Sequence, residues 1–268
     1  MQSVLPATEA DLERRFGGLK RLYGEAGYQR LRQARVAVVG VGGVGSWAAE
    51  ALARCGVAAL TLVDLDHVAE SNVNRQIHAL DATLGQAKVL AMQERIAQIH
   101  PGCTVTCIDE FVDASNWPGL LPSAVDVVID ACDDPRAKQA MAAWSLRERR
   151  PLVMVGAAGG KRQAHLVDVA DLIHVTHDPL LAQLRQRLRR DQLIPRAEGK
   201  PRDCGLRCVF SREAISRPEL GAACATDTSG ATPAFDANLN CHGYGSVVTV
   251  TASFGLVAAN EAIRLLLA

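Results

Sequence analysis

A run of β-branched residues followed at once by closely spaced glycines limits this chain more than any other feature. Residues 35–45 read RVAVVGVGGVG, and the next residues, SWAAEALARCG, have the small and leucine side chains of a helix. Strand, glycine turn and helix in this order suit phosphate binding, because glycines allow close backbone approach and the helix N-terminus supplies positive potential. Asp64 ends the next strand, where an acid can bind ribose hydroxyls. A nucleotide site is therefore predicted at Gly40, Gly42, Gly45 and Asp64.

Strand and helix patterns alternate along the first half of the chain. The predicted strands lie at 35–40, 59–64, 103–109, 125–130 and 151–156, and the predicted helices lie at 46–56, within 86–102 and at 136–150. Strands that alternate with helices are typical of α/β proteins. We therefore predict a Rossmann-like, doubly wound and mostly parallel sheet.

The alternation weakens after about Gly156, although one domain is expected over residues 1–268. We divide this domain into an N-terminal helical segment at 1–34, a nucleotide-binding core at 35–156 and a C-terminal part at 157–268. The C-terminal part is expected to face the substrate and the partner subunit. It should contain mixed strands, a crossover loop and a closing apolar element that ends in a helix.

Composition excludes some classes of protein. Lysine plus arginine and aspartate plus glutamate both number 29, so no overall charge indicates a polyanionic partner. The N-terminus has no secretory pattern, and the eight cysteines then indicate reduced thiols in the cytoplasm. Residues 243–260 carry no charge but include threonines, a serine and glycines, and they are short for a bilayer span. We expect a buried element there and no membrane span.

A polar loop after the second strand distinguishes ATP from a dinucleotide. It reads SNVNRQ from residue 71 and is followed by GQAKV, which contains Lys88. A triphosphate extends beyond the glycine turn and needs further cations as pyrophosphate leaves, whereas a dinucleotide does not. Arg75 and Lys88 would supply them, and Asp133 or Asp134 would hold Mg²⁺. Taken singly, each cation is also explained as a solvated surface charge, so it is their joint placement that favours ATP.

The order of these motifs resembles the ubiquitin-activating-enzyme-like superfamily, whose members adenylate carboxylates. The resemblance rests on GxGGxG, LVDLDHV, SNxNRQ, GQxK and IDACDD, and it extends from about Arg15 to Gly160. It implies that Asp133 serves the metal and that Arg75 and Lys88 take part in catalysis. The nucleotide contacts that it implies are Gly43, Asp64, Ser71, Asn72, Asn74, Arg75 and Lys88.

One branch of the superfamily is similar over nearly the whole chain. The segments RFGGLKRLYG, NVNRQIHAL, GAAGG and CVFS resemble the tRNA threonylcarbamoyladenosine dehydratases. This resemblance implies that ATP activates the threonyl carboxylate of a modified adenosine next to the anticodon as an acyl-adenylate. The tethered carbamoyl group would then close a ring and release AMP.

Cysteine spacing bears on zinc. Branches that activate small sulfur-carrier proteins usually carry two CxxC pairs that bind zinc, whereas the nearest pairs here, 103–107 and 204–208, are both C-x₃-C. We therefore predict ATP and Mg²⁺ without zinc. Cys103 and Cys107 share one face of a strand and are expected in the core.

Cys241 lies beside His242 in the polar stretch and matches a cysteine of the dehydratase branch. A functional thiol would accept an acyl group, or a persulfide from a cysteine desulfurase or another sulfur-relay partner. A bystander cysteine is an equally good explanation, because the tethered carbamoyl group can attack without a thiol.

Two partners are expected besides ATP. Seven basic residues lie between 185 and 202, which supports tRNA as a partner, although a solvated helix face explains the charge nearly as well. The superfamily resemblance implies a homodimer, with the C-terminal apolar element and the 151–156 strand as candidate contacts.

Three functions stay open from the sequence. They are the RNA-modifying cyclase, an adenylyltransferase for the C-terminus of a sulfur-carrier protein, and a nicotinamide oxidoreductase or nucleotide-binding scaffold. The absence of CxxC pairs favours the first over the second, and the polar loop argues against the third.

Overall fold

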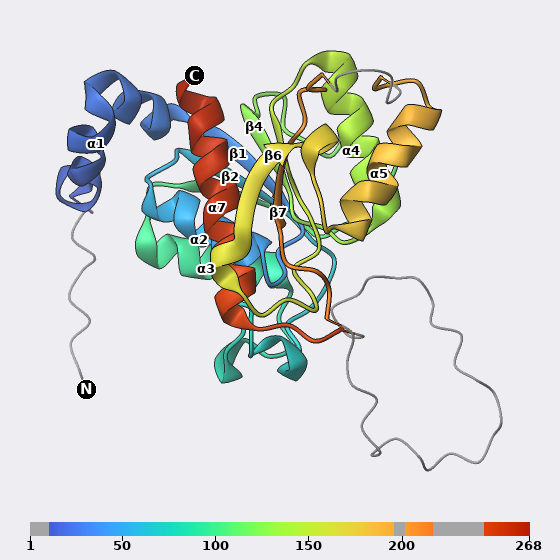
Figure 1. The fold of residues 1–268 in the computed structure, drawn as a ribbon. Coiled ribbons are helices and arrows are strands. Elements are labelled where there is room, and N and C mark those ends of the chain that lie inside the picture. The colour runs from blue at the N-terminus through green and yellow to red at the C-terminus, as the bar shows by residue number, and fades with distance from the viewer. Residues whose placement is uncertain (1–10, 196–201, 217–243) are drawn as a thin grey trace, which may run out of the picture.

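The computed structural model describes residues 11–195, 202–216 and 244–268. Within them, seven strands form one sheet in the order β3-β2-β1-β4-β5-β7-β6, parallel except for the antiparallel pair of β6 and β7. Helices cover both faces of the sheet (Figure 1). The predicted Rossmann-like, doubly wound sheet is confirmed, and its strand order reverses between β1 and β4.

The predicted elements occur within a few residues of their expected ends. The strands are β1 (Arg35–Val39), β2 (Ala59–Val63), β3 (Thr104–Ile108), β4 (Val127–Asp130), β5 (Leu152–Val155), β6 (Val167–Asp171) and β7 (Arg207–Ser211). The α-helices are α1 (Leu12–Gln33), α2 (Gly45–Arg54), α3 (Lys88–Ile99), α4 (Pro135–Glu148), α5 (Pro179–Arg190) and α7 (Val248–Leu267). Short 3₁₀ turns are η1 (Glu70–Asn72), η2 (Asp81–Thr83), η3 (Ala164–Leu166) and η4 (Leu172–His174).

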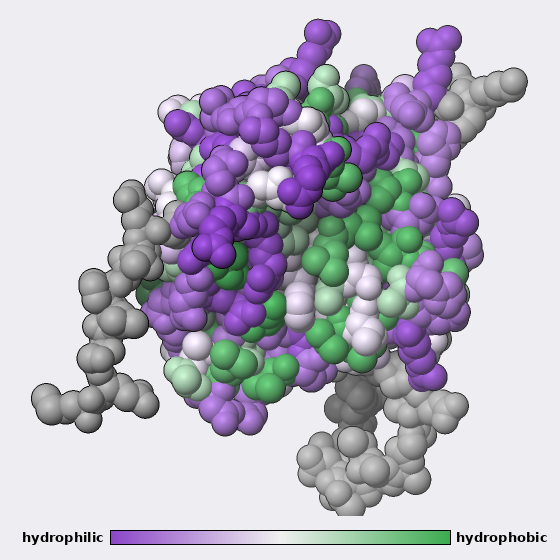
Figure 2. All heavy atoms as spheres, turned by 90° about the vertical axis from the view of Figure 1, so that its left-hand side faces the viewer, coloured by the Kyte–Doolittle hydropathy of each residue, from purple (hydrophilic) through white to green (hydrophobic). Residues whose placement is uncertain are grey.

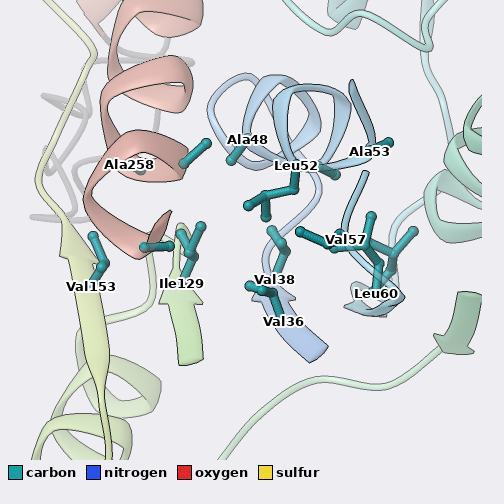
Figure 3. Close-up of a cluster of buried hydrophobic side chains, with 14 of the residues drawn as sticks. Val36, Val38, Ala48, Leu52, Ala53, Val57, Leu60, Ile129, Val153 and Ala258 are labelled. Atoms are coloured by element: carbon teal, nitrogen blue, oxygen red, sulfur yellow. The ribbon is translucent and has the colours of Figure 1, made fainter. Parts of the chain in front are cut away.

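The core has two layers, one on each face of the sheet, because successive side chains of a strand point to opposite faces. In β1, Val36 and Val38 join the layer under α2 and α7. Ala37 and Val39 join the layer under α4 and α5. Figure 3 shows the first layer, with side chains of α2 and α7 lying over the central strands.

Glycines in the turn after β1 are required by geometry. Gly40 has φ +84°, and a Cβ there would lie 2.8 Å from the backbone nitrogen of Cys132. A Cβ at Gly45 would overlap the carbonyl oxygen of Gly40. Gly45 therefore allows α2 to start directly against the turn.

The C-terminal apolar element is one continuous helix, α7, rather than an extended segment that becomes a helix. It packs across the sheet, with Phe254 and Ala258 fully buried. At Gly255 it approaches α2 so closely that a Cβ would clash with Val44 and Trp47. Among the described helices, α7 alone has the length and apolar composition that could cross a membrane. Its packing agrees with the predicted buried element.

Two strands, β6 and β5, bear on the sequence predictions. β6 was not predicted individually; it is a five-residue edge strand in which only Asp171 is buried. β5 lies between β4 and β7, and all its residues are buried. Of residues 151–156 only Pro151 is exposed, and the contribution of this strand to a subunit contact stays a prediction.

Candidate active site

A cavity of about 520 Å³ opens along the carboxyl ends of β1, β2, β4 and β5. Doubly wound sheets bind ligands at this edge, where the strand order reverses. The predicted site residues that line the cavity are Gly40, Gly42, Gly43, Asp64, Ser71, Asn72, Arg75, Lys88 and Asp133. The structure thus brings together residues from five separate segments. Gly45 and Asn74, although described, lie outside the cavity lining.

Asp64 is fixed at the end of β2 by backbone donors. Its Oδ2 accepts the N–H of Val41 at 2.6 Å, and its Oδ1 accepts the N–H of Asp66 at 2.9 Å. Burial raises the pKa of the Asp64 carboxyl, and the charge of Lys88 opposes this shift. Each carboxylate oxygen keeps a second acceptor position, which suits a hydroxyl-bearing ligand.

Lys88 is the first residue of α3, and its side chain is buried. Its Nζ lies 2.6 Å from Asp66 Oδ2 and 4.0 Å from Asp64 Oδ1. The sequence interpretation missed Asp66 as the partner of this lysine. The signal was present in LVDLDHV, since residues two apart beyond a strand can both face its carboxyl end.

Arg75 lies over the glycine turn. A Cβ at Gly43 would be 3.2 Å from Arg75 Cγ. The guanidinium donates to Ser71 O at 2.6 Å and to Asn74 Oδ1 at 3.0 Å. Trp47 of α2 donates its Nε1–H to Arg75 O at 2.9 Å. These bonds hold the Arg75 guanidinium beside the glycine turn.

Asn74 supports this arrangement from outside the cavity. Its side-chain Nδ2 donates to Ser246 O at 3.0 Å, just before α7, while its Oδ1 accepts the bond from Arg75. Asn74 therefore connects the polar loop to the C-terminal part. Asn72 is buried, and its Oδ1 accepts the N–H of Ala69 within the same loop.

The structure distinguishes the two aspartates after β4. Asp134 caps α4 by accepting the N–H groups of Arg136 and Ala137 at 2.8 and 2.7 Å. Asp133 is exposed, lines the cavity, and accepts no hydrogen bond within the described part of the chain. Both aspartates line the cavity, but only in Asp133 are both carboxylate oxygens free of hydrogen bonds within the described residues.

A buried ion pair under this loop escaped the sequence interpretation. Lys138 Nζ lies 3.0 Å from Asp130 Oδ2, and both side chains are fully buried. Burial raises the pKa of Asp130, and the charge of Lys138 opposes this shift. The pair fixes the end of β4, from which Asp133 extends.

Comparison with known protein families identifies the family of this chain. The ThiF family model matches residues 14–268, nearly the whole chain. The chain belongs to the ThiF family. The superfamily resemblance of its motifs is thereby confirmed.

Individual relatives refine this assignment. A tRNA threonylcarbamoyladenosine dehydratase of Escherichia coli strain K12 is 44 % identical over 257 residues, which cover 95 % of this chain and 94 % of that protein. The crystal structure of E. coli tRNA N6-threonylcarbamoyladenosine dehydratase, TcdA, in complex with ATP matches with a TM-score of 0.82 at 41 % identity, covering 97 % of this chain and 96 % of that one. A molybdopterin-synthase adenylyltransferase of Salmonella typhimurium is 37 % identical over 49 % of this chain and 52 % of that protein. The predicted branch is thus the more similar one over the full length.

The described cysteines of this ThiF-family chain are buried or partly buried, and Cys132 lines the cavity. Cys107 on β3 and Cys103, just before it, pack against the core, as predicted. Burial raises the pKa of Cys103 to about 11 and that of Cys204 to about 12. Residues 11–195, 202–216 and 244–268 contain no cluster of three His, Cys, Asp or Glu side chains that could hold a metal. Cys241 and Cys224 lie outside the described residues.

The basic run is only partly a surface feature. On α5, Arg185 donates to the carbonyls of Leu172 and Val175, and Arg187 donates to Pro135 O at 3.2 Å. Arg190 is exposed over 73 % of its side chain. Arg196 and Lys200 belong to the residues that are not described. Among the described arginines of α5, Arg190 is the most accessible to a polyanion.

Proposed function

We propose that this chain catalyses the ATP-dependent dehydration of N6-threonylcarbamoyladenosine in tRNA, next to the anticodon, to the cyclic derivative. The observation that carries the proposal is the 44 % identity to a protein of that name along 95 % of this chain. The cavity supports it, because a glycine turn, a fixed carboxylate and two cations converge there.

The first step of this reaction joins the substrate to ATP. One oxygen of the threonyl carboxylate attacks the α-phosphorus, the bond to the β-phosphate oxygen breaks, and pyrophosphate leaves. Negative charge grows on the departing pyrophosphate, so fixed cations lower the barrier. We assign this role to Arg75 and Lys88. Asp64 would bind the ribose, and the backbone at Gly40, Gly42 and Gly43 would approach the phosphates, with Ser71 and Asn72 shaping the loop.

The second step closes the ring. The carbamoyl group attacks the activated carbonyl carbon and loses a proton, and AMP leaves with the oxygen that the carboxylate contributed. Because nucleophile and electrophile are tethered in one substituent, this attack has a large proximity advantage. A thiol is not required, so Cys241 is an assisting group or the recipient of sulfur from a relay partner in this proposal.

The residues present fit a magnesium ion. Asp133 offers a carboxylate without a competing hydrogen bond in the described chain, and Mg²⁺ prefers one or two carboxylates together with phosphate oxygens. Asp133 would hold the ion against the triphosphate. When bound, Mg²⁺ neutralises phosphate charge during transfer.

The proposal also covers the cellular location, the oligomeric state, the RNA partner and the metal content of the enzyme. We propose that the enzyme acts in the cytoplasm as a homodimer, binds tRNA, and needs no zinc. We also keep the division into helical segment 1–34, nucleotide-binding core 35–156 and substrate-facing part 157–268.

Mass spectrometry of tRNA nucleosides tests the proposal directly. Purified protein, ATP, Mg²⁺ and tRNA that carries threonylcarbamoyladenosine should yield a nucleoside lighter by one water, with AMP formed in equal amount. Omission of ATP should abolish both products. If pyrophosphate instead forms only with a sulfur-carrier protein that ends in Gly-Gly, which becomes an acyl-adenylate, the adenylyltransferase alternative replaces this function.

A further inference from the structure

The cavity extends past the residues assigned to the nucleotide. Along the sheet edge, those residues follow β1, β2 and β4, and they include every charged group that the proposed first step uses. The part beyond β4 is lined by residues of different character, namely Val155, Gly156, Ala157, Ala158, Gly159, Leu180 and Thr251. These residues are small or neutral. This half of the cavity, called here the β5 half, has no role in the nucleotide assignment.

The backbone of the β5 half is tied to the start of α5 by one buried carboxylate. Asp178 is the N-cap of α5, and its Oδ1 accepts the N–H of Leu181 at 3.0 Å. Its Oδ2 accepts the N–H of Ala157 at 2.9 Å. The side chain therefore connects the helix to the loop that follows β5.

Gly156 has no room for a side chain because of the same carboxylate. A Cβ at Gly156 would overlap Asp178 Oδ2, and it would lie 3.0 Å from Leu181 Cδ1. The Gly156 N–H donates to Val209 O at 2.8 Å, which fixes the loop from the β7 side. The close approach of the Gly156 backbone to Asp178 is therefore fixed by packing and hydrogen bonding on both sides of the loop.

Two buried lysines, Lys161 and Lys138, act electrostatically on Asp178. Lys161, at the end of the loop, is buried and donates to Glu213 O at 2.8 Å. Lys138, whose partner is Asp130, attracts Asp178 from the α4 side. Burial raises the pKa of Asp178, while the two N–H donors and the two lysines oppose this shift. A buried carboxylate with two backbone donors and two nearby cations is a costly arrangement to retain for capping alone.

We propose that the β5 half of the cavity is the subsite for the carboxylate-bearing arm of the substrate, and that Asp178 is the positioning residue that sets its shape. The inference rests on the proposed function and deepens it. The threonyl arm is short, branched and uncharged apart from its carboxylate. It matches a neutral lining of small residues, with Leu180 available to its methyl group and Thr251 to its hydroxyl.

The position of the subsite also suits the first step. The glycine turn follows β1, and Asp133 follows β4, so the phosphates are expected over these two strands. The ribose is assigned to Asp64, which follows β2. A carboxylate that enters over β5 therefore reaches the phosphates from the opposite side. Asp178 touches neither reactant in this arrangement, because it acts through the backbone of Gly156 and Ala157.

Two variants test the role of Asp178 from opposite sides of one contact. G156A pushes the loop away from the carboxylate. D178N keeps one oxygen to cap α5 but loses the charged bond to Ala157, since asparagine is as good an N-cap as aspartate. Both should raise the KM for modified tRNA roughly tenfold or more, because each displaces the backbone that lines the subsite. The Kd for ATP, measured by calorimetry, should stay unchanged.

G18A is the matched control. Gly18 lies on α1, and the nearest atom to an added Cβ is the end of a flexible arginine at 3.9 Å. It should leave both the KM and the Kd as in the wild type. Thermal unfolding of each variant shows whether the fold is kept.

A double-mutant cycle makes the test independent of folding losses. D178A removes the atom that a Cβ at Gly156 would strike, so G156A should add little to the KM in the D178A background. Independent, multiplicative effects would overturn the positioning role. Equal loss of ATP affinity and tRNA affinity would overturn the subsite. If the wild type converts no tRNA, both proposals fall; if it does and the variants match it, only this one falls.

Discussion

Lys88 shows how much of the site depends on single side chains. It is buried at the start of α3 beside two carboxylates, Asp64 and Asp66. A buried ammonium needs such partners, because an unpaired charge in the protein interior is strongly disfavoured. In the proposed reaction a phosphate oxygen would replace part of this pairing.

Replacing Lys88 with Ala should lower turnover by ~10²-fold or more, because the lysine would stabilise charge on the departing pyrophosphate. The affinity for ATP should change less than turnover does. Asp64→Ala should show the reverse balance, since its loss acts through the ribose. Single-turnover AMP formation and calorimetry measure the two quantities. Lys20→Ala, at an exposed ion pair on α1, is the control; normal turnover in Lys88→Ala would remove this lysine from the reaction.

His78 belongs to the same polar loop and gives a pH dependence of stability. It is almost fully buried, and both ring nitrogens lack a hydrogen-bond partner in the described chain. Burial lowers its pKa from 6.5 to about 4. The folded state therefore keeps His78 neutral at a pH where the unfolded chain binds a proton.

This difference in proton binding makes the folded state less stable as the pH falls. The stabilisation is fully present above pH 6.5 and is lost as the pH falls towards 4, by about 3 kcal/mol in the free energy of unfolding. Urea unfolding at several pH values should show a smaller decrease for His78→Leu than for the wild type. An equal decrease in both proteins would assign the acid sensitivity to other groups.

Helix α5 carries arginines that bond to neighbouring elements and one arginine that is exposed to solvent. Arg187 anchors α5 to Pro135 at the start of α4, whereas Arg190 extends into solvent. The two arginines were expected to be equivalent from the sequence. Of these two arginines, only Arg190 can therefore be replaced to test tRNA binding without removing a contact between helices.

Arg190→Glu should weaken tRNA binding steeply, reduce its salt dependence and leave ATP binding unchanged, because neutralised phosphates release counterions. Arg187→Glu should also lower the thermal stability, by about 1 kcal/mol for the lost hydrogen bond. Fluorescence anisotropy with labelled tRNA at several salt concentrations measures the first effect. Unaltered tRNA affinity of Arg190→Glu at every salt concentration would exclude this helix from the RNA contact.

Much of the fold was predictable because its signals are local. Strand periodicity, helix spacing and the glycine turn all lie within short windows, and each predicted strand is present. β6 was less visible, since its partner β7 follows about forty residues later. The residues assigned to the nucleotide were equally predictable, because they lie at motif positions in the sequence. Lys138 and Asp178 were not, because their function depends on partners brought together only by folding.

The whole molecule exposes apolar surface that a subunit contact would cover. Figure 2 views the side that carries α1, α2 and α3, and apolar side chains gather there in a contiguous area. Large exposed apolar patches often mark interaction sites. The exposed large apolar residues include Val73, Leu80, Leu90 and Leu256.

Sedimentation at micromolar concentration should show a homodimer. Leu256→Asp, on the exposed side of α7, should shift the protein towards the monomer by placing a charge in the contact. The far-ultraviolet circular dichroism spectrum should stay as in the wild type. A wild-type protein that sediments as a fully active monomer would contradict the proposed assembly.

The packing of α7 against α2 has a consequence for synthesis. α2 begins at residue 45, whereas its neighbour α7, which also brings Thr251 to the cavity, begins only at residue 248. At roughly 5 to 20 residues per second, more than ten seconds separate the two. During that interval the nascent chain has uncovered apolar strands and an unfinished cavity. The cavity is therefore complete only once α7 has docked against α2.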